Sequence, residues 1–164
     1  GPDKGIPYLI DAWAALGWQD AQLIIAGEGS QQWGPYIQTR AGKGRFALPG
    51  YVPDVATFYN AITVYCQPSV SEGFGCEIIE AMSYGRPVIA STGAGASDAV
   101  LPDGWLVPPG DSDALAGAIL DARDIFPEVL RDMGLCGREK AKDYLWKRIR
   151  KQYVQVFQQL HARA

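Results

Sequence analysis

Histidine and cysteine, which supply most zinc ligands, are scarce in this sequence. One histidine and three cysteines occur among 164 residues. Cys66, Cys76 and Cys136 are odd in number and widely spaced, which matches neither a disulfide framework nor a zinc motif. We therefore expect free thiols in a reducing compartment. His161 lies near the end of the last expected helix, where a solvated side chain is the ordinary outcome.

Long apolar runs and dense basic patches are also lacking. Without a run of about 18 apolar residues, this stretch of chain is expected to be soluble. A net charge of −3 and a pI near 5.1 argue against nucleic acid as a partner. One basic cluster lies on the expected terminal helix, at Lys147, Arg148, Arg150 and Lys151. A solvated helix face is its main interpretation, and contact with a membrane surface is the alternative.

A length of 164 residues with 48% hydrophobic content is typical of one globular domain spanning residues 1–164. Strand-like apolar runs alternate with helical patterns, which predicts a Rossmann-like, three-layer α/β/α domain with a mainly parallel sheet. The expected strands cover 21–26, 45–48, 62–67, 88–91 and 104–107. The expected helices cover 6–16, 32–41, 55–60, 76–84, 112–125, 128–143 and 145–162, with a short helical turn at 97–100.

The first and the last expected helices are both unusual for an α/β domain. The chain opens with a helix, whereas such folds normally lead with a strand, so we expect that the sequence has been cut from a longer protein. The last helix has apolar residues spaced three or four apart, at Ile149, Tyr153, Val156, Phe157 and Leu160. Such a stripe must be buried against something. The core of this domain is the main expectation, and an absent partner domain is the alternative.

The most informative stretch is residues 71–82, SEGFGCEIIEAM, which joins a buried strand to a helix. A turn at the carboxyl end of a strand is where open α/β sheets place their ligands. Gly73 and Gly75 lack a Cβ, so the backbone can bend sharply and approach a ligand. The first N–H groups of the helix, together with its dipole, form an anion site that needs no metal.

Two carboxylates flank this anion site. Glu72 precedes it, and Glu80 stands about one turn into the helix at ~1.5 Å per residue. Carboxylates in contact with phosphates would repel them, so these two are better suited to accept hydrogen bonds from hydroxyl groups on either side. Glu77 is interpreted as a helix-start acid that favours the dipole.

Five segments, taken in order, are similar to the C-terminal, donor-binding half of a GT-B glycosyltransferase of the large retaining family 4. The resemblance covers nearly the whole chain and is carried by DKGIPYLIDAWAAL, LIIAGEGS, LPGYVPD, QPSVSEGFGCEIIEAMSYGRPVIAS and DGWLVPPGD. It implies catalytic roles for Lys4, which neutralises the diphosphate, and for Glu72, which holds hydroxyls of the donor sugar. Glu80, the second acid of the E-x7-E motif, would hold the ribose.

The resemblance also implies further substrate-binding positions. The backbone against the sugar and phosphates would be Gly73, Phe74, Gly75 and Cys76; the turn at the nucleotide would be Gly27 and Gly29; the segment beside the base would be Gly50, Tyr51 and Val52. Asp54 matches a base contact, although an N-cap of the next helix explains it equally well. Asp98 stands where many members have a glutamate and is assigned no role.

The resemblance implies a hexosyltransferase that uses a nucleotide diphosphate sugar, retains the anomeric configuration and needs no metal or other cofactor. The acceptor, whether glycan, lipid or small molecule, would bind to the absent N-terminal domain, and an arginine ahead of the Lys-Gly pair would also be absent. The isolated domain would then be inactive. The resemblance also implies a cytoplasmic location. The full enzyme could associate peripherally with the cytoplasmic face of a membrane.

Two main interpretations compete with this one, and a GT-B relative that is not a transferase, such as an epimerase or a phosphorylase, fits the E-x7-E context less well. A Rossmann oxidoreductase requires G-x-G-x-x-G after a strand, and residues 27–32, GEGSQQ, lack the third glycine. A regulatory module of the same fold could bind a nucleotide or nucleotide sugar without transferring it, because fold alone does not settle function. The presence of Lys4, Glu72 and Glu80 argues against that second interpretation.

Overall fold

The computed structural model describes residues 2–40 and 44–161. Its strands are all paired in parallel and fall into two sheets. The first sheet pairs β1 (Gln22–Ala26) with β2 (Arg45–Gly50), and the second has the order β3 (Tyr65–Gln67), β4 (Val88–Ser91), β5 (Trp105–Val107). Each expected strand is present. The alternation of strands and helices suggested one sheet, but the structure has two, and β1 does not pair with β3. Residues of both strands line one cavity.

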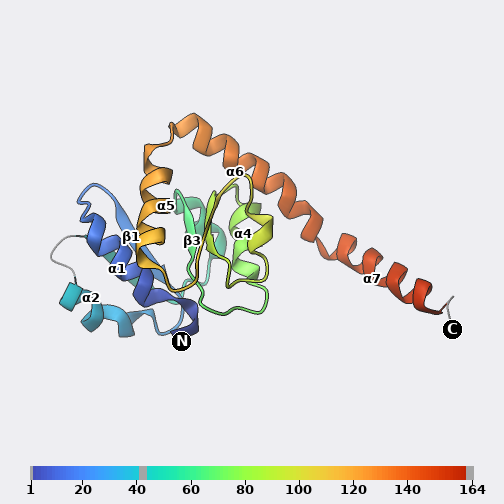
Figure 1. The fold of residues 1–164 in the computed structure, drawn as a ribbon, viewed down its shortest axis with the longest axis horizontal. Helices are drawn as coiled ribbons and strands as arrows, with labels where there is room; N and C mark the ends of the chain where they lie inside the picture. Colours follow the sequence, from blue (N-terminus) through green and yellow to red (C-terminus); the bar gives the residue numbers. More distant parts are fainter. Residues whose placement is uncertain (1, 41–43, 162–164) are drawn as a thin grey trace.

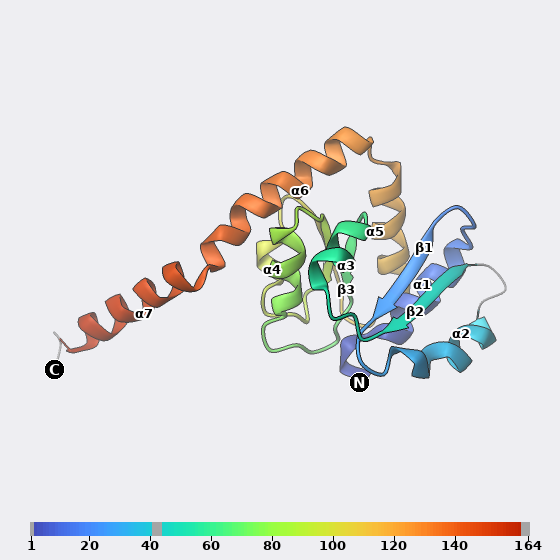
Figure 2. The ribbon, with the colours of Figure 1, turned by 180° about the vertical axis from the view of Figure 1, so that it is seen from behind.

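Helices cover the second sheet on both faces, which confirms the three-layer α/β/α expectation (Figures 1 and 2). Ile89 of β4 packs with α1 (Ile6–Leu16) and α5 (Ser112–Asp124). Its neighbours Val88 and Ala90 face the other way and pack in a core shared by α3 (Val55–Ala61), α4 (Cys76–Ser83) and α6 (Pro127–Ala141). Alternate residues of a strand point to opposite faces, so the burial of all four residues of β4 is what a strand covered on both sides requires.

The remaining elements differ in detail from the sequence expectation. The helix expected at 32–41 begins as a 3-10 turn, Ser30–Trp33, and continues as α2 (Gly34–Arg40); residue 41 lies outside the described residues. Further 3-10 turns occur at Pro2–Lys4, Ser97–Ala99 and Lys142–Tyr144. Ile10, Ile25 and Ile37 form a separate core where α1 and α2 pack on the first sheet.

The expectation that the last helix packs into the core of this domain is wrong. α7 (Trp146–His161) has no buried residue and extends away from the sheets (Figures 1 and 2). Tyr153, Phe157 and Leu160 of its apolar stripe are 60%, 66% and 58% exposed. The physical reason is that α6 carries the chain past the edge of α4, so α7 begins beyond the layers. Residue 162, the expected end of this helix, lies outside the described residues.

The chain ahead of α1 is fastened to the loop that follows β3. The amide of Val70 donates a hydrogen bond to the carbonyl oxygen of Asp3 at 2.7 Å. Gly5 has a φ of +67°, and a Cβ at this position would lie 1.8 Å from the carbonyl oxygen of Pro68. A side chain is therefore excluded by both the backbone conformation and the space. No helix within the described ranges has the combined length and hydropathy needed to cross a membrane.

We expect Gly5→Ala to lower the free energy of unfolding by roughly 1–3 kcal/mol or more, because it adds left-handed strain to a backbone clash. Urea unfolding followed by circular dichroism measures the change. Gly117→Ala is the matched control, since Gly117 lies within α5 and its Cβ would meet nothing within 4 Å. That control should stabilise the protein by about 0.5–1 kcal/mol. Equal stability of Gly5→Ala and the wild type would contradict the proposed contact.

Candidate functional site

A cavity of about 490 Å³ lies at the carboxyl ends of β1 and β3. This volume is in the range of small-molecule sites. The first sheet contributes Ala26 and Gly27, and the second contributes Gln67 and Pro68. The wall is completed by the N-terminal turn, the segment after β2, α3 and the first turns of α4, at Lys4, Tyr51, Val52, Phe58, Tyr59, Glu77 and Glu80. The position agrees with the sequence expectation of a site where strands end.

The turn that precedes α4 is held in place by a second loop. Glu72 forms an isolated parallel bridge with Ala94, and its amide donates to the carbonyl oxygen of Gly93 at 2.9 Å. Gly75 caps α4 with a φ of +85°, a conformation that L side chains rarely adopt. Gly73, by contrast, has no positive φ, so the expectation of an unusual backbone conformation holds for Gly75 alone. The helix therefore starts at Cys76, and Glu77 in its first turn lines the cavity.

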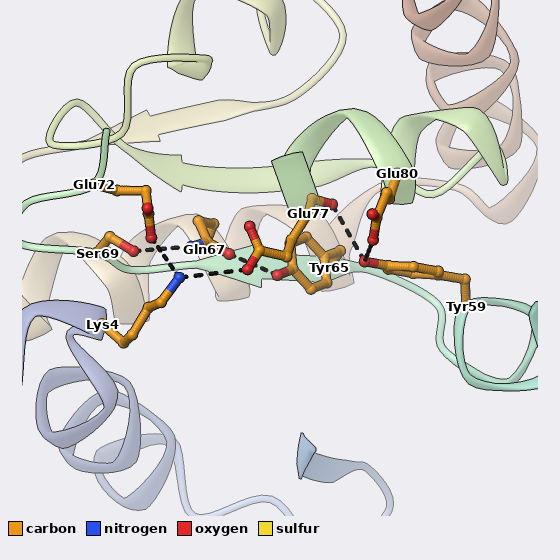
Figure 3. A network of polar contacts seen from close by, with 8 residues as sticks. All are labelled: Lys4, Tyr59, Tyr65, Gln67, Ser69, Glu72, Glu77 and Glu80. Carbon is orange, nitrogen blue, oxygen red and sulfur yellow. Dashed lines mark hydrogen bonds and ion pairs between the residues drawn. The ribbon is translucent and has the colours of Figure 1, made fainter. Parts of the chain in front are cut away.

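Lys4 reaches across the cavity to the start of α4 (Figure 3). Its ammonium group forms an ion pair with Glu72 and lies 3.4 Å from Oε1 of Glu77. Lys4 is far in sequence from both glutamates, and the N-terminal turn brings it to them. The hydrogen bond with Glu72 raises the pKa of Lys4, burial opposes that rise, and the charge of Glu77 adds to it. The lysine is therefore a firmly protonated cation at neutral pH.

Glu80 is held by a tyrosine from α3. Oη of Tyr59 donates to Oε2 of Glu80 at 3.2 Å and also lies 3.4 Å from the carbonyl oxygen of Glu77 (Figure 3). The Tyr59 ring is 3% exposed and stacks on Tyr84 with centroids 5.2 Å apart. Burial, followed by the charge of Glu80, raises the pKa of Tyr59 above its ordinary value, so the hydroxyl stays a donor. A buried donor thus fixes an exposed carboxylate.

A row of polar side chains follows β3 along the floor of the site. Oη of Tyr65 donates to Oε1 of Gln67 at 2.6 Å, and Nε2 of Gln67 donates to Oγ of Ser69 at 2.9 Å (Figure 3). Cys66 lies in the same strand. Part of the residue is accessible, but its thiol is buried, and burial raises its pKa to about 12. The thiol is therefore protonated and a poor nucleophile at neutral pH. All three cysteines are free, as the sequence predicted.

The structure gathers some of the predicted site residues and separates others. Lys4, Gly27, Tyr51, Val52 and Glu80 line the cavity, and Glu72 reaches it through Lys4. Gly29 precedes the 3-10 turn that follows β1, and Gly50 is the last residue of β2, where its carbonyl oxygen accepts from the amide of Gly27 at 2.8 Å.

Five further predicted residues do not line the cavity: Asp54, Gly73, Phe74, Gly75 and Cys76. Phe74 is 44% exposed, with its ring centroid 5.9 Å from that of Tyr144, and Cys76 is exposed at the helix start. Asp54 caps α3, because its carboxylate accepts from the amide of Thr57 at 3.2 Å. The N-cap explanation of Asp54 is thus confirmed, and its contact with a base stays a prediction.

Sequence reasoning missed two side chains of the site, Glu77 and Tyr59. Glu77 was interpreted as a helix-start acid only. It lies three residues before Glu80, a spacing that puts both on one helix face, and this signal could have found it. No comparable signal pointed to Tyr59. Nowhere in residues 2–40 and 44–161 do three or more His, Cys, Asp or Glu side chains gather in a group suited to a metal ion.

Known proteins share both the sequence pattern and the fold. A family model described as glycosyl transferases group 1 matches residues 1–124. A phosphatidyl-myo-inositol mannosyltransferase of Mycobacterium leprae is 34% identical over 96% of this chain and 43% of its own length. A sucrose-phosphate synthase structure from Thermosynechococcus elongatus has a TM-score of 0.81 and 32% identity, over 100% of this chain and 44% of its own. HepE of Anabaena, solved with UDP and glucose, shares the fold, with a TM-score of 0.80 and 24% identity. The match covers 96% of this chain and 45% of the HepE chain.

We expect the Tyr59 hydroxyl and the Glu80 carboxylate to be energetically coupled. In a double-mutant cycle with Tyr59→Phe and Glu80→Ala, urea unfolding should give a coupling of about 1 kcal/mol, the net value of one hydrogen bond. Tyr65→Phe is the matched control, because that hydroxyl donates to Gln67 instead. It should show no coupling with Glu80→Ala. Additive effects in the Tyr59 cycle would mean that the tyrosine does not position this carboxylate.

Proposed function

The chain belongs to the group 1 family of glycosyl transferases, and from this premise we propose that it is the donor-binding domain of a retaining hexosyltransferase. It spans less than half the length of the M. leprae mannosyltransferase and of the sucrose-phosphate synthase. The proposed activity is that of an intact enzyme in which a further domain binds the acceptor. The isolated domain would bind the nucleotide sugar without transferring the sugar.

One observation carries the proposal: a lysine from the N-terminal turn faces the start of α4 in a cavity with carboxylates on both sides. A nucleotide diphosphate sugar has the complementary order of groups, with hydroxyls at each end and a diphosphate in the middle. Lys4 and the first amides of α4 would hold the diphosphate. Glu72 would accept hydrogen bonds from the sugar and Glu80 from the ribose, with the base toward Tyr51 and Val52.

The same groups suit the transfer step. The bond between the anomeric carbon and the diphosphate oxygen breaks, and the acceptor oxygen bonds to that carbon from the same face. The acceptor proton passes to the departing diphosphate. Negative charge grows on this leaving group, and Lys4 and the helix-start amides are already oriented to stabilise it. Glu72 would keep the sugar in place while its ring carries positive charge.

Relatives support the choice of a hexose. The M. leprae relative is named as a mannosyltransferase, and structures of HepE hold UDP, UDP with glucose, or UDP-glucose. We propose that the donor binds without a metal ion, since Lys4 and backbone amides would neutralise the diphosphate. We also propose a cytoplasmic location for the enzyme, with peripheral attachment to the membrane as one arrangement for a lipid acceptor.

Titration calorimetry with UDP, GDP and ADP tests the donor site. One nucleotide should bind with equal affinity in EDTA and in Mg²⁺. Glu80→Ala should weaken it by about 10- to 100-fold, because a hydrogen bond to a charged group is lost. Glu139→Ala is the control: Glu139 is exposed and pairs with Lys142 at the surface, so affinity should not change. Binding of none of the three nucleotides by the intact protein would count against the donor site and favour a module of other function.

Steady-state kinetics of the intact enzyme tests the role of Glu72. We expect Glu72→Gln to lower kcat by about 100-fold, which is the order seen when one oriented group at the reacting centre is removed. The affinity for the free nucleoside diphosphate should not fall, because this product lacks the sugar and Glu72 competes with it for Lys4. Equal losses in kcat and in nucleoside diphosphate affinity would place Glu72 at the phosphates instead of the sugar.

A further inference from the structure

Glu77 occupies the middle of the candidate site. It is the second residue of α4, its side chain is 43% exposed, and its Oε1 lies 3.4 Å from Nζ of Lys4. Figure 3 shows its carboxylate between Glu72 on one side and Glu80 on the other. In the proposed function these two outer acids hold hydroxyl groups. The position between them is the one assigned to the diphosphate.

The charges around this position are unbalanced for an anion site. Among the described residues that line the cavity, Lys4 is the one cation, whereas Glu28, Glu77 and Glu80 are acidic. Lys4 is also shared, since Glu72 and Glu77 both contact it. A diphosphate that enters must replace these carboxylates as the ion-pair partner of the Lys4 ammonium group. It then lies within a few ångströms of a fixed negative charge on Glu77, where repulsion is only partly screened by water.

We infer that Glu77 is a specificity-determining residue that competes with the diphosphate for Lys4. This inference rests on the proposed donor site. Repulsion grows with the charge of the ligand, and a nucleoside diphosphate carries one more ionisable oxygen than the nucleotide sugar from which it is released. Glu77 therefore weakens the product more than the donor. In this way the site holds the sugar donor, and product release is favoured after transfer.

A helix-start acid with no such role would behave differently. Favourable interaction with the dipole is the general effect of an acidic residue in the first turn. Glu128 occupies the same second position in α6 and is exposed. Glu77 differs because it faces the cavity and shares its cation. Variants at the two positions therefore distinguish two effects. Glu128→Gln removes only a helix-start charge, whereas Glu77→Gln also removes a charge inside the site.

The test is a calorimetric comparison of the wild type, Glu77→Gln and Glu128→Gln at low ionic strength. For whichever base binds among UDP, GDP and ADP, the ligands are the nucleoside, the nucleoside diphosphate and the nucleotide hexose. Glu77→Gln should tighten nucleoside diphosphate binding by about three- to tenfold, as expected for one partly screened charge at a few ångströms. The gain should be smaller for the nucleotide hexose and absent for the nucleoside. Glu128→Gln should change none of the three affinities.

Any other pattern of affinities would overturn the inference, and the patterns differ in what they imply. An equal gain for all three ligands, or a gain shared by Glu128→Gln, would overturn the inference, because charge in the site would not be the cause. Weaker binding by Glu77→Gln would also overturn it, since Glu77 would then be a direct contact of the ligand. Nucleotide binding by the wild type with no change in Glu77→Gln defeats this inference alone. Failure of the wild type and both variants to bind any nucleotide would defeat the proposed function as well.

Discussion

The close contact between the N-terminal turn and the end of β3 is the constraint on which the site depends. Gly5 lies against the carbonyl group of Pro68 with a backbone conformation and a clearance that a side chain would not tolerate. Asp3 accepts hydrogen bonds from the amides of Val70 and Ser71 in the same loop. The residue between these two contacts is Lys4, so its ammonium group is directed at the start of α4. A residue from the first turn of the chain thereby joins a motif that lies some 70 positions later in the sequence.

Local chemistry explains what could be read from the sequence. Apolar runs predicted the five strands that the structure describes. The glycine before Cys76 predicted the start of α4, because a helix cap depends on neighbouring residues only. Asp54 was recognisable as an N-cap for the same reason. The ion pair of Lys4 with Glu72, the hydrogen bond of Tyr59 with Glu80 and the division of the sheet are long-range features. They depend on how elements pack, and one sequence carries no signal for that.

The site combines rigid and solvated groups in a consistent way. Tyr59 is buried among the helices that cover the second sheet, whereas the carboxylate of Glu80 that it holds faces the cavity. A buried frame limits the rotamers of the exposed groups, so less entropy is lost when a ligand orders them. The first sheet and the second contribute opposite walls without a shared ladder between β1 and β3. A bound nucleotide would thus contact both halves of the domain.

α7 illustrates how unevenly stability is distributed along this chain. The helix gains little from burial: none of its residues is fully buried, and Ile149 in its first turns is half-buried. Sixteen residues are close to the length at which a helix without tertiary support is marginal in water. Its backbone hydrogen bonds therefore open independently of the sheets, with a local free energy far below that of global unfolding. Amide exchange and proteolytic cleavage would follow this local equilibrium in α7, while β4 reports the stability of the whole domain.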